Sequence, residues 1–304
     1  MLADACFDRA LERLTRATSC MQHLSLPMPG GQLPLVPKAL PVYLLHDESM
    51  AARGHRMIKL LSAAGAPDLT LITCASRQVV DGLNFADRTC LFPEYALTHW
   101  SKPVPGMANG TLSLALKHQL AYRDIGQRRL SAALLLEDDS TVPPTLWVQL
   151  AAYTIPADAH VFYVGSYSSN PRGGSLKDED VVPGLKPTVR VRSTMGRNGT
   201  RPAILASSAY VVTLDGAMRL LQPVRAETDI QLSLLTPSPL CKRTPPSCYP
   251  ALGTAGCGPT VGRCALSPPP RQYGPTRWII WQDPSAHGRG SHNLPRNDKG
   301  ANVT

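Results

Sequence analysis

The chain has 304 residues, of which 43% are hydrophobic and 17% charged, so it can build one large domain or two small ones around a sizeable core. Its net charge is +9, but eight Lys/Arg and two Asp/Glu lie from Cys241 to the C-terminus, which assigns most of the excess to the tail. In the rest of the chain positive and negative charges are nearly balanced, which argues against a nucleic-acid groove through the main domain. The basic tail leaves contact with an anionic surface open, and no apolar run reaches the roughly 18–20 residues of a membrane span.

The first part of the chain predicts a helix, a linker and the beginning of an α/β unit. Residues 24–41 hold five prolines and two glycines, which is typical of a linker. The helix over 50–64 carries Arg53 and Arg56, and a strand, polar turn and basic helix in this order can begin a nucleotide-binding unit. The chain has no Gly-rich phosphate loop. The elements expected here are a helix over 2–17, a strand over 41–45, a turn over 46–49, a helix over 50–64 and a strand over 69–73.

A short apolar run followed by three acids is the most informative stretch. Residues 132–136 are apolar and lead into Glu137, Asp138 and Asp139, which predicts a strand buried on both faces with acids at its carboxyl end. Ligands of open α/β sheets bind at that edge. Three adjacent carboxylates repel one another, so they favour a cation with hard oxygen ligands, Mg²⁺ or Mn²⁺. In extended backbone Glu137 and Asp139 would point to one side and Asp138 to the other. A solvated turn, or a helix N-cap at Asp139 or Ser140, is the alternative interpretation.

The other elements alternate between helix and strand. The helix over 111–125 carries Lys117 and His118, and a lone helical histidine is more often a surface or satisfied residue than a ligand. We expect residues 167–200 and 237–275 to be loops, the second because it holds ten prolines. The remaining elements expected are strands over 160–166 and 204–212, a turn over 213–217, helices from Met218 and over 227–235, and a last strand over 278–281.

Four cysteines in the C-terminal region predict two disulfides. Their spacings of seven, nine and seven residues are wider than those of paired zinc ligands, and the segment has too little apolar surface to order itself. These cysteines are Cys241, Cys248, Cys257 and Cys264. Glycosylation sequons, compatible with a secretory lumen, begin at Asn109, Asn198 and Asn302. No signal peptide is visible, so we expect the lumen of the endoplasmic reticulum or Golgi if an upstream signal or anchor exists. Otherwise the protein is cytosolic and its cysteines are free.

Four segments between residues 40 and 235 carry a family resemblance through their order and separation. They are an opening strand with an arginine-bearing helix at 42–57, the helix start at 110–118, the apolar strand with Glu-Asp-Asp at 134–139, and the strand and Gly-Ala turn at 208–217 followed by Asp229. In this order they resemble the glycosyltransferase family of bacterial lipooligosaccharide galactosyltransferases and procollagen galactosyltransferases. Residues 1–38, 83–107 and 237–304 depart from the family's pattern.

The resemblance implies an α/β fold of GT-A type, an open, mostly parallel sheet with flanking helices, and a Cys/Pro-rich C-terminal extension. The corresponding domains are an N-terminal helix and linker over 1–38, a catalytic domain over 39–236, and a Cys/Pro-rich segment with a basic tail over 237–304. The implied activity is the transfer of a hexose, with galactose expected, from a UDP-sugar to a hydroxyl of a glycan or protein acceptor. Transfer would invert the anomeric carbon and use Mn²⁺ or Mg²⁺.

The resemblance and the residue types together assign candidate roles. An inverting displacement needs a carboxylate base on the acceptor side, and Asp229, with Glu227 beside it, is the expected base. Both acids would otherwise only stabilise the N-terminus of a helix. The expected metal ligands are Glu137 and Asp139, and the expected donor-binding residues are Tyr43, Leu44, Arg53, Arg56, Lys117 and Asp138.

Two other functions are compatible with the same residues. The first is a metal-dependent phosphohydrolase that uses the same acids with further ligands, for which His118, His160 and His287 are candidates. The second is a binding or adhesion module that keeps the fold without turnover. Intact acids speak against the second.

Overall fold

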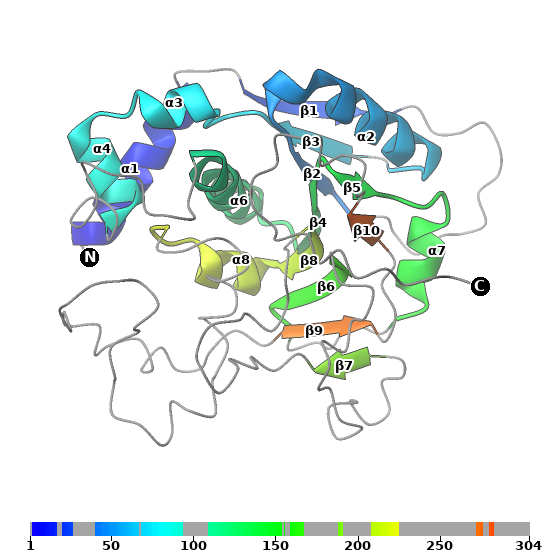
Figure 1. The fold of residues 1–304 in the computed structure, drawn as a ribbon. Helices are drawn as coiled ribbons and strands as arrows, with labels where there is room; N and C mark the ends of the chain where they lie inside the picture. The colour runs from blue at the N-terminus through cyan, green and yellow to red at the C-terminus, as the bar shows by residue number, and fades with distance from the viewer. Residues whose placement is uncertain are drawn as a thin grey trace, which may run out of the picture.

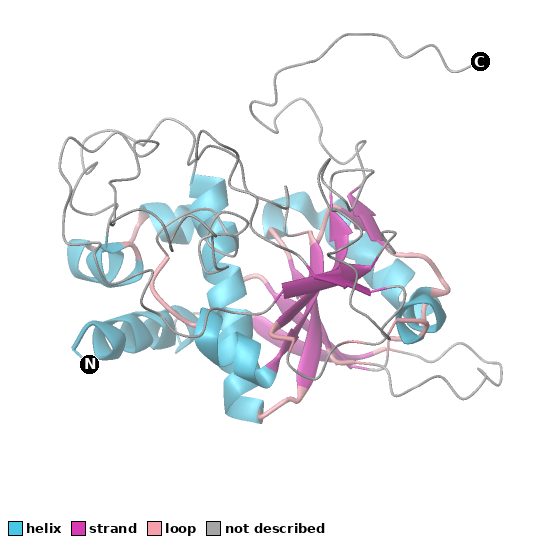
Figure 2. Cartoon of the chain, turned by 90° about the horizontal axis from the view of Figure 1, so that it is seen from below, coloured by secondary structure: helices cyan, strands magenta, loops and turns pink. Residues whose placement is uncertain are grey.

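The computed structural model shows an α/β fold in which one sheet lies between two groups of helices (Figures 1 and 2). The residues that it describes are 2–16, 20–26, 40–66, 68–93, 109–153, 155, 159–166, 188–190, 208–224, 272–275 and 280–282. The helices are α1 (Leu2–Arg16), the 3₁₀ turn η1 (Glu48–Met50), α2 (Ala51–Ala63), α3 (Arg77–Asp81), α4 (Phe85–Leu91), α6 (Asn109–Arg128), α7 (Leu146–Ala151) and α8 (Leu214–Leu220). No helix in these ranges is long and apolar enough to cross a membrane.

The sheet is mixed, with its strands in the order β1-β3-β2-β4-β8-β6-β10-β5. β9 pairs with β6 and β7 pairs with β9 at the side of this row. The strands are β1 (Met21–Ser25), β2 (Val42–Leu45), β3 (Asp68–Ile72), β4 (Ala132–Glu137), β5 (Ser140–Thr141), β6 (Val161–Ser166), β7 (Thr188–Arg190), β8 (Ala209–Thr213), β9 (Gln272–Pro275) and β10 (Ile280–Gln282).

Strands β3, β2 and β4 are parallel to one another, β6 is parallel to both β9 and β10, and β8 runs antiparallel between β4 and β6. The register pairs Leu45 with both Ile72 and Glu137, so three strands end at one edge. The α/β class is therefore confirmed, but the sheet is mixed rather than mostly parallel. A fully apolar strand has the same residue pattern in either direction, and so the sequence could not show that β8 is antiparallel.

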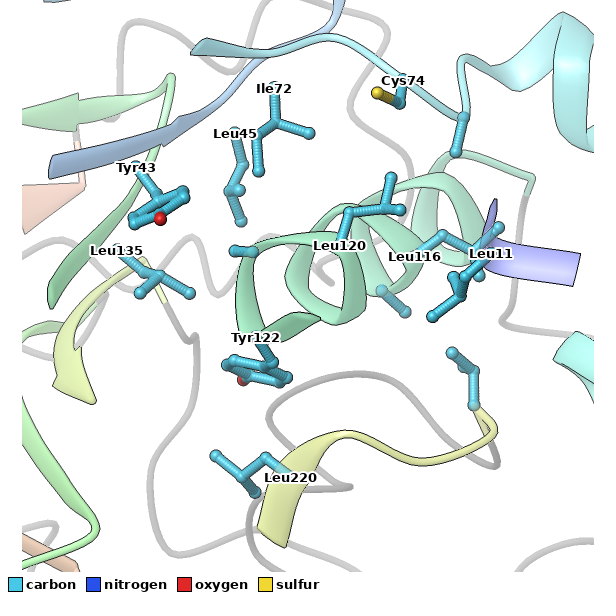
Figure 3. Close-up of a cluster of buried hydrophobic side chains, with 14 of the residues drawn as sticks. Leu11, Tyr43, Leu45, Ile72, Cys74, Leu116, Leu120, Tyr122, Leu135 and Leu220 are labelled. Carbon is cyan, nitrogen blue, oxygen red and sulfur yellow. The ribbon is translucent and has the colours of Figure 1, made fainter. Parts of the chain in front are cut away.

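One face of the sheet packs against α6, with α1 and α8 around it. Tyr43 and Leu135 project from the sheet toward Leu120 of α6, while Leu11 of α1 and Leu220 of α8 close the cluster (Figure 3). All five side chains are at most 1% exposed. Each fully buried side chain of this size contributes about 1.5–3 kcal/mol, so this cluster fixes α6 firmly against the sheet.

The opposite face packs against α2 and α7. The alternate residues of the same strands, such as Leu44 and Leu136, meet Met57 and Leu61 of α2 and Trp147 of α7. β2 and β4 are therefore buried on both faces, as their unbroken apolar sequences predicted. Figure 1 shows α2 and α7 across the sheet from α6 and α8.

Two disulfides join the N-terminal region to the segment after β3. Cys6 of α1 pairs with Cys90 of α4, and Cys20, just before β1, pairs with Cys74, just after β3. These bonds were not predicted, because the local spacing of cysteines does not indicate pairs that are 84 and 54 residues apart. The four cysteines expected to form disulfides lie outside the described residues. Disulfides are typical of oxidising compartments.

Several expected boundaries need correction. The linker does not begin at residue 24, because β1 continues to Ser25 by pairing with β3. The predicted turn over 213–217 is instead the start of α8, because the Thr213 side chain accepts a hydrogen bond from the Gly216 amide and caps the helix. Of the two segments expected to be loops, 167–200 contains β7 and 237–275 ends with β9. In the unassigned stretch after residue 76, Ser76 and Asn84 cap the short helices α3 and α4.

Candidate functional site

A polar pocket opens at the carboxyl ends of β2 and β4. Its walls come from the β2–η1 connection, the first turn of α2, the start of α3, one face of α6 and the acids after β4. Its volume is about 130 Å³, smaller than the several hundred cubic ångströms of pockets that enclose a whole small ligand. The charged residues that line it are Asp47, Arg53, Arg77, Lys117, Glu137, Asp138 and Asp139. Such a lining suits the charged part of a ligand.

The three acids are buried and line this pocket together. Glu137, Asp138 and Asp139 are 9%, 8% and 7% exposed, so they are not a solvated turn. Strand β5 follows at Ser140, so Asp139 does not cap a helix. The expected alternation of sides fails after Glu137, because 138–139 form a turn rather than extended backbone. Ser208 holds this turn, since its carbonyl accepts hydrogen bonds from the Glu137 amide and the Ser140 hydroxyl.

Asp138 is held by groups that follow β2. Its Oδ2 lies 2.8 Å from Nδ1 of His46 and accepts a hydrogen bond from the Asp47 amide, and its Oδ1 lies 3.5 Å from Arg53. His46 is only 6% exposed. The sequence predicts only a turn at His46 and no role for its side chain. The sequence feature that could have indicated a role for His46 is its position directly after a buried strand.

Gly54 gives His46 the space it needs. A Cβ at this position of α2 would lie 2.6 Å from Nε2 of His46 and 2.8 Å from its Cε1. Real Cβ atoms do not approach so closely, and so the imidazole lies where only a glycine on the facing helix permits it. A helix-interior glycine of this kind costs stability relative to alanine, and here it makes room for the partner of Asp138.

Three cations face the acids across the pocket. Lys117 is 3% exposed, its ammonium donates to Ser113 Oγ at 3.1 Å, and burial lowers its pKa. Arg53 reaches Asp138, and Arg77 lies 3.5 Å from Asp47. Burial alone would raise the pKa of Asp47, but hydrogen bonds from Ser49 and the neighbouring cations lower it overall. The pocket therefore pairs anionic and cationic walls at close range.

Arg77 is not among the predicted site residues, because it lies on a short helix that the sequence pattern does not indicate. Its guanidinium packs over Gly110 at the start of α6, where a Cβ would lie 3.1 Å from Nε. Arg53 and Lys117, predicted to bind the donor, do line the pocket. Arg56 instead approaches the carbonyls of Asp138 and Ser140, at 3.4 and 3.3 Å, and supports the turn.

The structure places Tyr43 and Leu44 away from the pocket. The Tyr43 side chain is buried on the α6 face, where its hydroxyl donates to Asp124 at 2.6 Å. Leu44 is buried on the α2 face. Leu45 is the β2 residue that lines the pocket, because strand alternation turns it to the α6 face next to Glu137.

His118 lies behind the acids in the core. Its Nε2 is 3.8 Å from Oε1 of Glu137, and its Nδ1 is 2.6 Å from the Tyr210 hydroxyl. Burial lowers the pKa of His118 to about 3, so the ring is neutral. The other histidines considered for a metal site are elsewhere: His160 bonds to Asp215 at 2.8 Å, and His287 lies outside the described residues.

The oxygen atoms of the pocket's carboxylates suit a divalent cation that also takes ligands from water or substrate. Within the described ranges, no three His, Cys, Asp or Glu side chains are arranged to hold a metal ion by themselves. Asp138 is bonded to His46 and lies 3.5 Å from Arg53, whereas Glu137 and Asp139, the two carboxylates predicted to bind a cation, line the pocket beside it. Mg²⁺ is commonly bound by one or two carboxylates together with water and substrate phosphates. The residues fit a metal that arrives with such a ligand.

The expected base falls outside what the structure describes, since neither Asp229 nor Glu227 is in the described ranges. The sequence matches no model of a known protein family and no curated protein.

Proposed function

We propose that this protein is a metal-dependent glycosyltransferase of GT-A type that uses a UDP-hexose as donor. The observation that carries the proposal is the pocket itself, in which three buried carboxylates and three cations meet at the carboxyl ends of parallel strands β2 and β4. That edge is where α/β sheets bind ligands. A sugar diphosphate bound with a divalent ion needs both signs of charge at one place, which neither an acidic nor a basic cluster alone would provide.

In this proposal the carboxylates and cations have separate tasks. Glu137 and Asp139 would hold Mn²⁺ or Mg²⁺, which supplies charge stabilisation for a leaving diphosphate when it is bound. Arg53, Arg77 and Lys117 bind and orient the anionic part of the donor. Lys117 is suited to this because it is buried and held in place by Ser113.

Asp138 takes a positioning task instead of contacting the donor. Its bonds to His46, Arg53 and the Asp47 amide fix the connection after β2 against the turn after β4. This keeps the two strand ends at a constant separation. Ordering of this kind before binding reduces the entropy lost when a ligand is held.

Asp229, with Glu227 as the alternative, remains the proposed general base for a hydroxyl of a glycan or protein acceptor. The disulfides of the described part fit a lumenal site of action in the endoplasmic reticulum or Golgi. Asp229→Asn should keep UDP-sugar binding and lose roughly 10²–10⁴-fold in turnover. A turnover within a few-fold of wild type would assign Asp229 to helix stabilisation only.

The test is release of UDP from a panel of UDP-hexoses in the presence of Mn²⁺, measured for wild type and Asp139→Asn. The proposal predicts release that a chelator abolishes and that the variant lacks while its fold is retained. Release of inorganic phosphate from nucleotides instead would identify a phosphohydrolase. Chelator-insensitive release, or full activity of Asp139→Asn, would contradict the assigned metal site. Absence of turnover with metal-dependent UDP binding would identify a binding module.

A further inference from the structure

His118 is a fully buried polar side chain that the proposed reaction does not yet use. Its ring is 1% exposed and stacks on Tyr210, with ring centroids 5.6 Å apart and ring planes 13° from parallel. Nδ1 is hydrogen-bonded to the Tyr210 hydroxyl, whereas Nε2 has no hydrogen-bond partner among the described residues. The Nε2 atom lies 3.8 Å from Oε1 of Glu137. A buried histidine therefore lies next to a carboxylate that lines the pocket.

Tyr122 extends this arrangement and determines which ring nitrogen carries the proton. Its hydroxyl contacts the Tyr210 hydroxyl, and either oxygen can donate. If Tyr122 donates to Tyr210 and Tyr210 donates to Nδ1, the ring proton is on Nε2 and faces Glu137. In the reverse order, the Tyr122 proton has no acceptor among the described residues, and the Nε2 lone pair faces a carboxylate oxygen. Each order leaves one donor without a hydrogen-bond partner among the described residues, but the first places the Nε2–H 3.8 Å from a carboxylate oxygen and avoids that repulsion.

We propose that His118 is a positioning residue that holds Glu137 toward the pocket through an Nε2–H donor, with Tyr210 and Tyr122 fixing the tautomer. The inference rests on the proposed function, because it takes Glu137 as a metal-facing carboxylate. The separation of 3.8 Å is too long for a hydrogen bond. We expect it to shorten when a cation draws Glu137 into place, since such bonds often tighten only in the complex. Carboxylates that bind metals are typically supported by a second hydrogen bond of this kind.

The tautomer can be measured without any ligand. The ¹⁵N chemical shifts of the His118 ring in the full-length, metal-free protein distinguish protonation at Nε2 from protonation at Nδ1. The proposal predicts the Nε2–H form in wild type and a mixture of both forms in Tyr210→Phe. An Nδ1–H ring in wild type would overturn the proposal, whether or not the protein binds a metal.

Two substitutions separate positioning from packing. An asparagine amide at position 118 reaches the place of Nδ1 and can still bond to Tyr210, whereas a glutamine amide reaches the place of Nε2 and can donate toward Glu137. Binding of Mn²⁺, alone and with UDP, is measured by the paramagnetic resonance of the free ion. We expect roughly 10–100-fold weaker Mn²⁺ binding in His118→Asn and recovery of most of this loss in His118→Gln.

The outcomes distinguish this inference from the proposed function. If both variants lose stability but bind Mn²⁺ as wild type does, His118 only packs and the inference is wrong while the metal site stands. If wild type itself does not bind Mn²⁺ with UDP, the proposed metal site fails, and the ring tautomer alone decides whether His118 donates toward Glu137. If the position-118 variants do not fold, Tyr122→Phe is measured instead, because it keeps all carbon contacts. It should weaken Mn²⁺ binding, and unchanged binding would count against the inference.

Discussion

Gly54→Ala tests whether His46 is confined as the structure shows. Alanine in the middle of a helix is favoured over glycine by about 1 kcal/mol, so α2 alone would gain from the change. The new methyl group, however, would lie 2.6 Å from His46 Nε2. Overpacking costs about 1–3 kcal/mol, and losing the hydrogen bond to Asp138 costs about 1.5–3 kcal/mol. The expected net loss in the free energy of unfolding is roughly 1.5–5 kcal/mol.

The assay is urea unfolding of wild type, Gly54→Ala and the matched control Gly82→Ala. Gly82 is exposed, has φ of −79°, and a Cβ there would meet its nearest atom at 3.4 Å. The control should lie within about 0.5 kcal/mol of wild type. In a His46→Ala background the clash is gone, so Gly54→Ala should become neutral or stabilising. A Gly54→Ala protein as stable as wild type, or a loss of stability that persists without His46, would show that Gly54 does not confine His46.

Three further predictions concern the fold. Gly216→Ala should destabilise the protein strongly, because the new Cβ would meet the backbone carbonyl oxygen of His160. Gly126→Ala should instead raise the free energy of unfolding by up to about 1 kcal/mol, because its Cβ would meet only the exposed Met218 side chain. Equal effects of the two substitutions in thermal unfolding would contradict this. Hydrogen bonds from Arg219 and His160 lower the pKa of Asp215, so Asp215→Asn should cost stability at neutral pH, and urea titrations should show the difference vanishing as pH falls through that lowered pKa. A difference that persists in acid would count against it. Replacing Cys20 and Cys74 by alanine should lower the free energy of unfolding by about 2–4 kcal/mol, and finding these two thiols free by mass spectrometry of lumen-expressed protein would disprove the bond.

The sequence was most informative where one physical cause dominates. The unbroken apolar residues of β4 predicted a strand buried on both faces, and the register confirms it beside β2. The helical spacing around Lys117 predicted α6, and the structure turns Lys117 into the pocket. In these elements the burial of apolar residues decides the backbone conformation, so a local pattern is sufficient.

The features that the sequence did not reveal depend on contacts between distant residues. His46 and Asp138 are 92 residues apart, and neither local pattern indicates their bond. From the sequence alone, Gly54 is a residue that lowers helix stability, and its role becomes visible only because His46 packs against it in the structure. Arg77 enters the pocket from a helix of only five residues, which is too short for a periodic signal. Tyr43 was assigned to the donor, but strand alternation turns it into the core.

Calorimetric titration of UDP into the full-length protein, with Mn²⁺ and with a chelator, is the most direct test of the proposed site. Asp139→Asn is measured alongside, with Asp87→Asn as control, because Asp87 is also a buried acid but pairs with Arg13 and Asn84 outside the pocket. We expect UDP to bind wild type and Asp87→Asn when Mn²⁺ is present, and chelation or Asp139→Asn to weaken this binding at least about tenfold. UDP binding that is equal with and without Mn²⁺, or equal in Asp139→Asn and wild type, would contradict it.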